Sequence, residues 1–201
     1  PTEVLVSAPK VVKKPNIGSI FEFNECFYGK VILNTETLAN IAYSSETWNE
    51  LISFHGDLVT DEYTRYLDEY YRFSLERFGK NWRYMDIVSI LFTAAKVLQP
   101  NNYLEIGVRR GRSLCSVVKA CPDVNVVAFD MWIQNDAGME NPGEEYVESE
   151  AKKIGHRGDI EFINGNSHET VPIYFSKNPG KTFDLITVDG DHTEEGAYAD
   201  L

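Results

Sequence analysis

The sequence predicts an α/β fold in which a parallel sheet is flanked by helices. Short apolar strands alternate with helical segments after Pro100, and this alternation is typical of βαβ units. The chain before that point contains mainly helical patterns. We therefore predict two parts: an N-terminal arm and helical extension at residues 1–80, and a sheet domain at residues 81–201.

The composition excludes several classes of protein. The chain has 201 residues, is 43% hydrophobic and carries a net charge of −12. Such an acidic chain is a poor match for nucleic-acid phosphates, so we predict no nucleic-acid partner. No apolar run is long enough to cross a membrane. Three cysteines, sparse and odd in number, favour reduced thiols and a cytoplasmic protein.

The first half of the chain predicts an extended arm at residues 1–20 and a hairpin at residues 21–33, with its turn near Tyr28-Gly29. Ser45 is expected to cap one helix, and a longer helix is expected from Thr60 to Gly79. Along the longer helix, apolar side chains recur at Tyr63, Tyr66, Leu67, Tyr70, Tyr71 and Leu75. This stripe favours a packed core or a subunit contact, and a substrate pocket is the alternative.

The second half predicts four strands and the helices between them. A helix at residues 85–98 is stopped by Pro100. Strands are then predicted at residues 103–106, 124–129, 160–163 and 183–188, with helices at residues 113–120 and 144–154 and others starting at 167 and 193. Right-handed crossovers bring the loops after these strands to the carboxyl edge of the sheet, where open α/β sheets bind ligands.

A glycine turn follows the first of these strands. Gly107 and Gly111 allow a tight bend and a close approach to a ligand. The helix that follows offers free N–H groups to an anion such as a carboxylate, and Ser113 can cap that helix or bind the carboxylate. Arg109 replaces the glycine that a dinucleotide site requires, and the spacing does not match a phosphate-binding P-loop. The turn therefore favours a ligand without a di- or triphosphate.

The other arginines and the histidines have simpler interpretations. We expect the run of Arg109, Arg110 and Arg112 to be solvated or paired with acids, and a grip on an anionic substrate is the less favoured alternative. Cys115 and Cys121 lack metal-ligand spacing and are expected to be small buried side chains. Three histidines without a motif are expected to be surface or structural residues: His55, His156 and His168.

An acid ends the next strand. Asp130 follows the glycines by about 20 residues, the distance at which a carboxylate accepts the hydroxyls of a ribose. A strand-ending aspartate that starts a turn is the alternative. The combination with the glycine turn favours the ribose ligand.

Taken together, these motifs resemble the class I S-adenosylmethionine-dependent methyltransferases. The resemblance runs from residue 84 to residue 201 and includes Glu-x-Gly-x-x-x-Gly, the acid after the second strand, Gly165-Asn166-Ser167 and Val-Asp-Gly-Asp-His. It is closest to the branch with macrolide-sugar O-methyltransferases and cephalosporin hydroxylase-like proteins. It implies a Rossmann-like fold of the methyltransferase type, truncated here after strand four of seven. Because the chain begins with Pro1 and stops at Leu201 inside a helical pattern, we expect a trimmed or partial chain.

The resemblance also implies the cofactor ligands. Glu105 and Gly107 would hold the methionine amine of S-adenosylmethionine, Gly111 and Ser113 would face its carboxylate, and Asp130 would hold its ribose.

On the adenine side, the resemblance implies Met131 or Trp132 beside the ring, with Asn166 and Ser167 near the amino group of the adenine.

The last motif carries the predicted chemistry of transfer. In the family branch, Asp189 would bind a divalent metal beside the cofactor and His192 would act as base. A histidine suits that role because its pKa lies near working pH, and Mg²⁺ on carboxylate oxygens of Asp189 and Asp191 could orient a hydroxyl. The alternative is a polar turn in which Asp191 or Thr193 caps the next helix. The branch takes its other metal carboxylates from beyond a fifth strand, which this sequence does not include.

We therefore predict a cytoplasmic O-methyltransferase that uses S-adenosylmethionine, with Mg²⁺ as a possible aid, to methylate a hydroxylated small molecule such as a sugar or natural product. Two hypotheses stay open beside it. One is a hydroxylase-like reaction at the same site. The other is a non-catalytic module that forms a homo-oligomer through the aromatic helix at residues 60–78 and the free edge of the fourth strand.

Overall fold

A computed structural model describes the backbone of residues 21–23, 26–28, 34–135 and 140–201 and the side chains of the last two ranges. Its contacts divide the chain into Pro1–Leu38 and Ala39–Leu201. The boundary that we expect near residue 80 stays a prediction. The arm at residues 1–20 lies outside the described residues.

The first unit contains a hairpin, as predicted. Strand β1 (Phe21–Phe23) pairs antiparallel with β2 (Cys26–Tyr28). The register places Phe23 opposite Cys26, so the chain reverses before Cys26 and the predicted turn near Tyr28-Gly29 is wrong. Helix α1 (Thr35–Ala42) follows and was not predicted. Its apolar residues Leu38, Ile41 and Ala42 share one face of the helix, but a helix of eight residues shows this pattern over only about two turns.

Between α1 and the sheet, the described chain forms α2 (Ser45–His55), α3 (Glu62–Phe78) and α4 (Ile87–Leu98), with a 3₁₀ turn at Gly79–Asn81. Their N-caps are Ser44, Asp61 and Asp86, each accepting a backbone N–H from three residues on. The predicted starts at Ser45 and Thr60 therefore lie one residue from the true caps. No helix in the described part of the chain is long and apolar enough to cross a membrane.

An aromatic cluster packs these helices together. The ring centroid of Trp48 lies 4.5 Å from that of Tyr71 and 5.0 Å from that of Trp82. Trp82 stacks on Tyr84 at 5.3 Å. The two polar groups at its centre are satisfied, since Trp48 Nε1 donates to the carbonyl of Tyr84 and the Tyr71 hydroxyl donates to Asp86. The predicted stripe thus divides into two groups. Leu67 and Tyr71 are buried in the core, whereas Tyr63, Tyr66 and Tyr70 are exposed.

The second half forms the predicted parallel sheet. Its strands are β3 (Asn102–Ile106), β4 (Asn125–Asp130), β5 (Ile160–Asn164) and β6 (Leu185–Val188), in the order β5-β4-β3-β6. All three pairings are parallel. The helices that follow the strands are α5 (Arg112–Ala120), α6 (Glu144–Lys153), α7 (Ser167–Lys177) and α8 (Glu194–Asp200).

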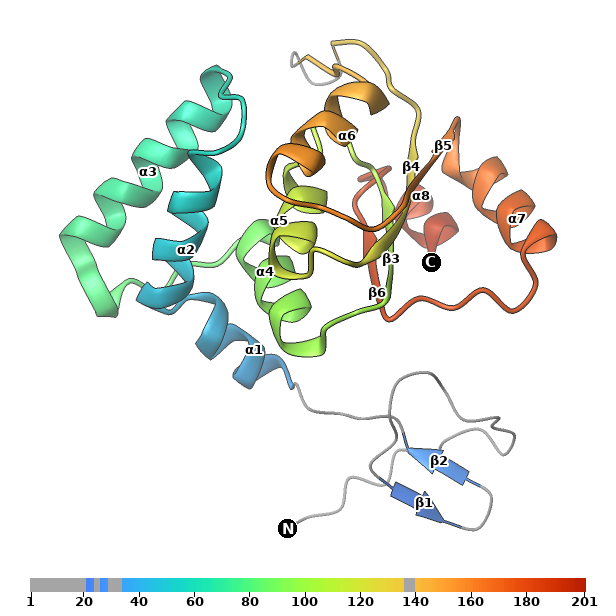
Figure 1. Ribbon diagram of the computed structural model, residues 1–201, viewed down its shortest axis with the longest axis horizontal. Helices are drawn as coiled ribbons and strands as arrows, with labels where there is room; N and C mark the ends of the chain where they lie inside the picture. The colour runs from blue at the N-terminus through green and yellow to red at the C-terminus, as the bar shows by residue number, and fades with distance from the viewer. Residues whose placement is uncertain (1–20, 24–25, 29–33, 136–139) are drawn as a thin grey trace. The chain divides into compact units, whose positions relative to one another are not determined.

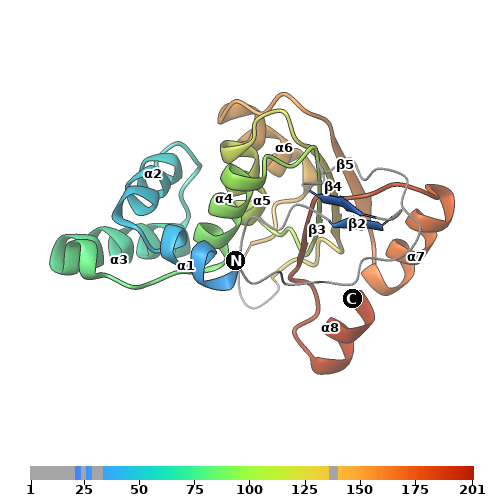
Figure 2. The same cartoon turned by 90° about the horizontal axis from the view of Figure 1, so that it is seen from below.

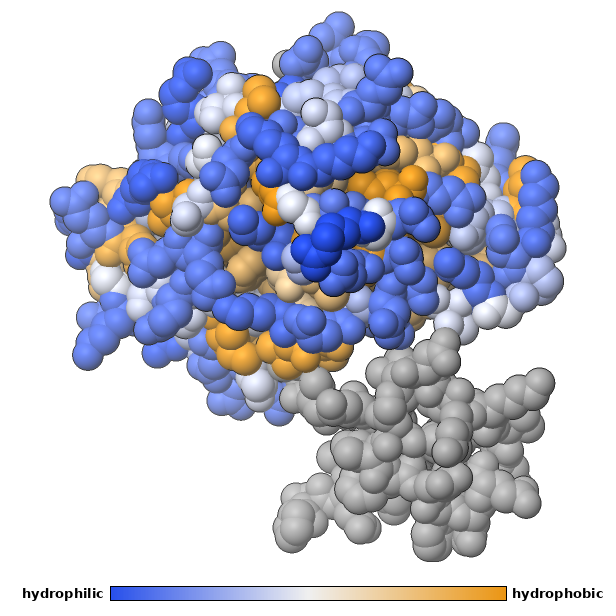
Figure 3. All heavy atoms as spheres, viewed as in Figure 1, coloured by the Kyte–Doolittle hydropathy of each residue, from blue (hydrophilic) through white to orange (hydrophobic). Residues whose placement is uncertain are grey.

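Two apolar layers enclose this sheet, because successive strand residues point to opposite faces. Tyr103 and Val126 pack in the core that includes α4, α5 and α6. Leu104 and Phe129 point the other way and pack against Tyr174 of α7. Figures 1 and 2 show α4, α5 and α6 on one side of the sheet and α7 and α8 on the other. The face in Figure 3 is mostly hydrophilic, with separate apolar patches.

Candidate functional site

The site lies where the strand order reverses. From β3 the chain moves outward to β4 and β5, and then β6 returns to the opposite side of β3. The carboxyl ends of β3 and β6 are therefore neighbours, and a reversal of this kind opens a crevice for ligands. A cavity of about 940 Å³ lies at this edge. Of the predicted site residues, it is lined by Gly107, Ser113, Asp130, Met131, Asn166, Ser167, Asp189 and His192.

Both glycines of the turn have backbone conformations that favour glycine, with φ of 86° at Gly107 and 70° at Gly111. A Cβ on Gly107 would lie 2.1 Å from the carbonyl oxygen of Asp189, and a Cβ on Gly111 would lie 2.6 Å from Val147. Glycine is thus required for packing the turn against the β6 loop and against α6. Gly111 does not line the cavity.

Asp130 fastens the glycine turn. Its Oδ2 accepts the backbone N–H groups of Val108 at 2.7 Å and Arg109 at 2.8 Å, while its Oδ1 accepts that of Trp132 at 2.6 Å. The side-chain amide of Asn141 lies 3.5 Å from Oδ1. The alternative of a strand-ending aspartate that organises a turn is therefore observed, and the same carboxylate lines the cavity.

Glu105 lies behind the turn. It is fully buried, and its two carboxylate oxygens accept hydrogen bonds from the hydroxyls of Ser113 and Tyr103. Tyr103 is also 2.8 Å from the hydroxyl of Thr187 on β6. Burial raises the pKa of Glu105 from its usual 4.5 to about 8, against the lowering effect of those two hydroxyls. Because it is fully buried behind the turn, Glu105 does not line the cavity. Its contact with a methionine amine stays a prediction.

The adenine side of the predicted site has two candidates, and the cavity distinguishes them. Met131 lines the cavity and is 54% exposed. Trp132 does not line it; its ring donates to Asn164 and packs against Phe162. The side chain of Asn166 caps α7 by accepting the N–H of His168.

The loop after β6 contains an Asp–His pair. Asp189 Oδ1 is 3.1 Å from His192 Nε2, and the imidazole is 78% exposed. Asp191 accepts the N–H of Thr193, a hydrogen bond that lowers the pKa of the Asp191 carboxyl. Thr193 in turn caps α8 through the N–H of Gly196. The capping alternative for this motif is thus observed as well, and it leaves Asp189 and His192 facing the cavity.

The predicted magnesium site is not formed by the residues that the structure describes. Among them, no group of three or more His, Cys, Asp or Glu side chains could hold a metal ion. Asp189 pairs with His192, and Asp191 is engaged in its cap.

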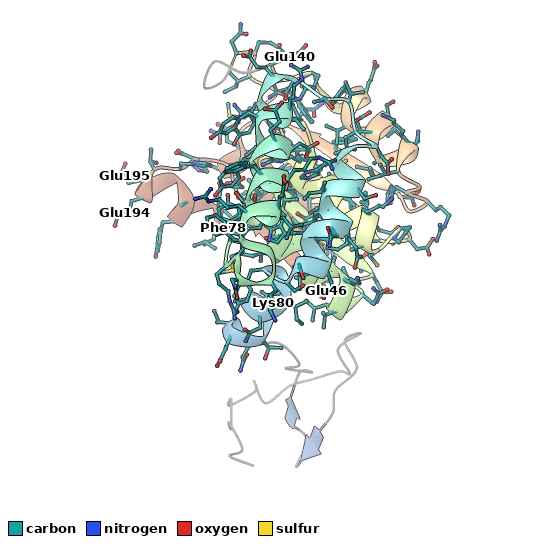
Figure 4. All side chains as sticks on the ribbon, turned by 90° about the vertical axis from the view of Figure 1, so that its left-hand side faces the viewer. Glu46, Phe78, Lys80, Glu140, Glu194 and Glu195 are labelled. Carbon is teal, nitrogen blue, oxygen red and sulfur yellow. The ribbon has the colours of Figure 1, made fainter. Side chains whose placement is uncertain are left out.

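Arg110 connects the glycine turn to the helical extension. Its guanidinium pairs with Asp61 at 3.1 Å and with Glu140 at 2.9 Å, and it donates to the hydroxyl of Tyr146. Asp61 begins α3, the helix that Figure 4 views from its side with Phe78 near one end and Glu140 beyond the other. The expectation that the arginines pair with acids is confirmed for Arg110.

Sequence reasoning missed several residues of the cavity wall. Asp61, Tyr63 and Thr64 of the α3 start and Arg112 of α5 line it, as does His168, which we expected to be a surface or structural residue. For His168 a signal existed, since it follows the Asn166-Ser167 motif directly. For Tyr63 the signal was the aromatic stripe, whose substrate-pocket alternative applies to this residue. For Asp61 and Thr64 none existed, because the position of α3 depends on long-range packing. His55 and His156 are structural, as expected: one pairs with Asp68 and the other with a main-chain carbonyl.

Comparison with known families gives one match. Residues 104–201 fit the model of a methyltransferase domain. Over that segment, slightly less than half of the chain, the sequence is similar to a methyltransferase domain. This match agrees with the resemblance to the class I, S-adenosylmethionine-dependent methyltransferases over the same segment. The macrolide-sugar branch stays a prediction. No curated protein matches the sequence.

Solved structures of methyltransferases are similar to this one at low identity. The calicheamicin methyltransferase CalS11 is 20% identical, with a TM-score of 0.44, over 85% of this chain and 73% of that one. An O-methyltransferase from Bacillus cereus, solved with S-adenosylhomocysteine, is 18% identical, with a TM-score of 0.44, over 77% and 66%. The Podospora anserina methyltransferase PaMTH1 is 18% identical, with a TM-score of 0.42, over 86% and 66%. Similarity at this level carries no argument about the site.

The methyltransferase domain supplies most of the cavity but not all of it. The match begins at residue 104, so the part of the wall formed by α3 and by Ile87 and Val88 of α4 lies outside it. The cavity therefore has one wall from the matched segment and another from α3 and the start of α4.

Proposed function

We propose that this methyltransferase transfers the methyl group of S-adenosylmethionine to a hydroxyl of a small molecule, such as a sugar or natural product. One observation carries the proposal: the glycine turn, Asp130 and the Asp189–His192 pair line one cavity. Its 940 Å³ suits a nucleoside-sized cofactor with a small acceptor, because ligand pockets commonly measure about 300–1,000 Å³.

The residues present fit the cofactor. Asp130 has about four lone-pair sites, of which three are taken by backbone N–H groups. The fourth is approached only by Asn141 at the limit of hydrogen-bond distance, so a ribose hydroxyl could replace that amide. Met131 offers an exposed apolar surface to an adenine. Asn166, Ser167, Gly107 and Ser113 would complete the binding site, with Gly111 and Glu105 supporting it from behind.

When bound, S-adenosylmethionine supplies the electrophilic methyl group. The residues of the chain must then align the acceptor hydroxyl and take its proton. With Asp189 accepting from Nε2–H of His192, the Nδ1 atom of the imidazole is left as the acceptor for that proton. Asp189 also stabilises the imidazolium that results. His192 is thus proposed as the base and Asp189 as the residue that orients it.

Magnesium assistance has less support. A Mg²⁺ ion takes several oxygen ligands in near-octahedral geometry, whereas among the described residues Asp189 already pairs with His192 and Asp191 accepts the N–H of Thr193. We assign no step to a metal. Addition of a chelator is expected to leave methyl transfer unchanged, and a loss of transfer that Mg²⁺ restores would reverse this conclusion.

Calorimetric titration with S-adenosylhomocysteine tests the proposal. Wild-type protein is expected to bind it, and Asp130→Ala to lose at least about tenfold in affinity. Because that change also releases three backbone N–H groups, each variant needs a thermal-unfolding measurement beside the titration. Asp123→Ala is the matched control, since Asp123 lies before the same strand on an exposed ion pair with Arg157.

His192→Ala separates catalysis from binding. It should bind S-adenosylhomocysteine normally and lose methyl transfer to a hydroxylated test panel of nucleotide sugars and catechols. A folded wild-type protein that fails to bind S-adenosylhomocysteine would refute the proposed function.

A further inference from the structure

Arg112 is a cation on the cavity wall that has no hydrogen-bond or ion-pair partner among the described residues. It is the first residue of α5, and its side chain lies 5.6 Å over the ring of Tyr63 on α3. A guanidinium carries five N–H donors. None of those of Arg112 forms a hydrogen bond or ion pair within the described part of the chain, and its Nη1 is buried from solvent.

This lack of a partner is unusual for the chain. Acids outnumber basic residues by 31 to 19, and the neighbouring Arg110 has found two of them. The carboxylates that begin α3 and α4 are engaged elsewhere: Asp61 pairs with Arg110, and Asp86 accepts from Tyr71 and from the N–H of Ser89. Buried donors in native proteins are nearly always satisfied, so an unpaired one on a cavity wall indicates a bound group from outside.

We propose that Arg112 binds an oxyanion, a carboxylate or phosphate, carried by the methyl acceptor. This inference rests on the proposed function and names the acceptor class: a hydroxylated molecule that is also an anion. Arginine is suited to it, because the planar guanidinium matches both oxyanions with two parallel hydrogen bonds. Tyr63 lies against the guanidinium and holds it toward the cavity.

The position of Arg112 favours the acceptor over the cofactor as the source of the anion. Arg112 itself lies in the matched segment, between Gly111 and Ser113, but its guanidinium lies over Tyr63 of α3, which is outside that segment. The groups proposed for the cofactor, from Gly107 to Asp130, follow β3 and β4 within that domain. A wall that is not part of the common domain is the natural place for recognition of the acceptor. The methionine carboxylate of the cofactor is the rival source of the same chemistry.

A water molecule is the second rival. Arg112 also borders a cavity of about 20 Å³ beside Thr64 and Glu150, which is room for a single water. A water there would satisfy Nη1 without any ligand, and in that case added oxyanions should have no effect that depends on Arg112.

The test uses inorganic phosphate and acetate as probes on the full chain, with chloride adjusted to hold ionic strength constant. The midpoint of thermal unfolding is measured with and without saturating S-adenosylhomocysteine. Three proteins are compared: wild type, Arg112→Gln and Arg83→Gln. Arg83 is a matched control because its guanidinium lies 4.4 Å over the ring of Tyr43 and does not line the cavity.

The proposal expects phosphate or acetate to raise the midpoint of wild type and Arg83→Gln when S-adenosylhomocysteine is already bound. Arg112→Gln should weaken that response by about tenfold in apparent affinity and leave the affinity for S-adenosylhomocysteine within about threefold. If instead the anions compete with S-adenosylhomocysteine and Arg112→Gln loses its binding, Arg112 serves the cofactor and the proposal is overturned. Equal responses in all three proteins would overturn it too. Failure of the proposed function is distinct, since wild type would then bind no S-adenosylhomocysteine at all.

Discussion

Glu105 offers a sharp test of the buried network behind the glycine turn. It is fully buried, and its pKa is raised to about 8 because burial disfavours the charged carboxylate. Folded protein therefore keeps the proton at neutral pH, whereas the unfolded chain releases it near the ordinary value of 4.5. The folded state binds more protons than the unfolded state between these values, so stability must fall as pH rises through that window.

The size of the effect follows from the same numbers. A single group with these two pKa values lowers the free energy of unfolding by about 2 kcal/mol between pH 6 and pH 8. Glu105→Gln removes the ionisation and keeps the shape. The amide can still bond to both hydroxyls, because Ser113 and Tyr103 can each donate or accept.

The assay is urea unfolding of both proteins from pH 5 to pH 9. All other titrating groups are shared, so their contributions cancel in the difference between the two curves. The Gln variant is expected to gain on wild type as pH rises and to level off relative to it near pH 9. Curves that stay parallel throughout, within about 0.5 kcal/mol, would show that Glu105 is charged in the folded protein and would refute this account of its burial.

Three further experiments test other parts of the structure. Gly107→Ala should lower the free energy of unfolding by at least about 3 kcal/mol, because it combines a positive φ with a backbone clash at 2.1 Å. Gly180 has a similar φ but open space around it, so Gly180→Ala should cost about 1 kcal/mol. Chemical unfolding compares the two variants, and equal losses of stability would contradict the packing argument. Burial raises the pKa of the Cys115 thiol, so iodoacetamide should leave it unlabelled in the native protein at pH 8 and label it in urea, as mass spectrometry of its peptide would show. Tyr66 and Phe73 on α3 are 63% and 61% exposed, as expected of a surface through which two copies of the chain could associate. Changing both to Ser should abolish any dependence of the sedimentation coefficient on protein concentration without lowering the midpoint of thermal unfolding. Association that persists in this variant would exclude α3 as the contact between copies.

The sequence was a good guide to local features and a poor one to what surrounds them. The strands, the glycine turn and Asp130 could be predicted because each depends on short-range spacing, and the fold sets all of them at one edge. The burial of Glu105 could not be predicted, because it sits in a hydrogen-bond network that includes Tyr103 and Thr187, and Thr187 lies on another strand late in the chain. The aromatic stripe suggested a substrate pocket as an alternative, but that Tyr63 is the stripe residue on the cavity wall follows from the packing of α3.

Helix boundaries show the same division. Ser44 and Ser45 are equivalent as letters, and only the extended backbone of Ser44 makes it the cap. For the motif after β6, both interpretations of the sequence apply to different residues. Thr193 caps α8 and Asp191 accepts the N–H of Thr193, while Asp189 and His192 form the pair at the cavity.

Arg110 has a mechanical consequence for ligand entry. One side chain from the glycine turn is clamped to the start of α3, to Glu140 and to Tyr146 of α6. A shift of the turn when a ligand arrives is therefore transmitted to α3, and α3 carries Tyr63. Arg110 thus couples the glycine turn to the α3 wall, and a ligand bound at one of them should change the affinity of the other for its own ligand.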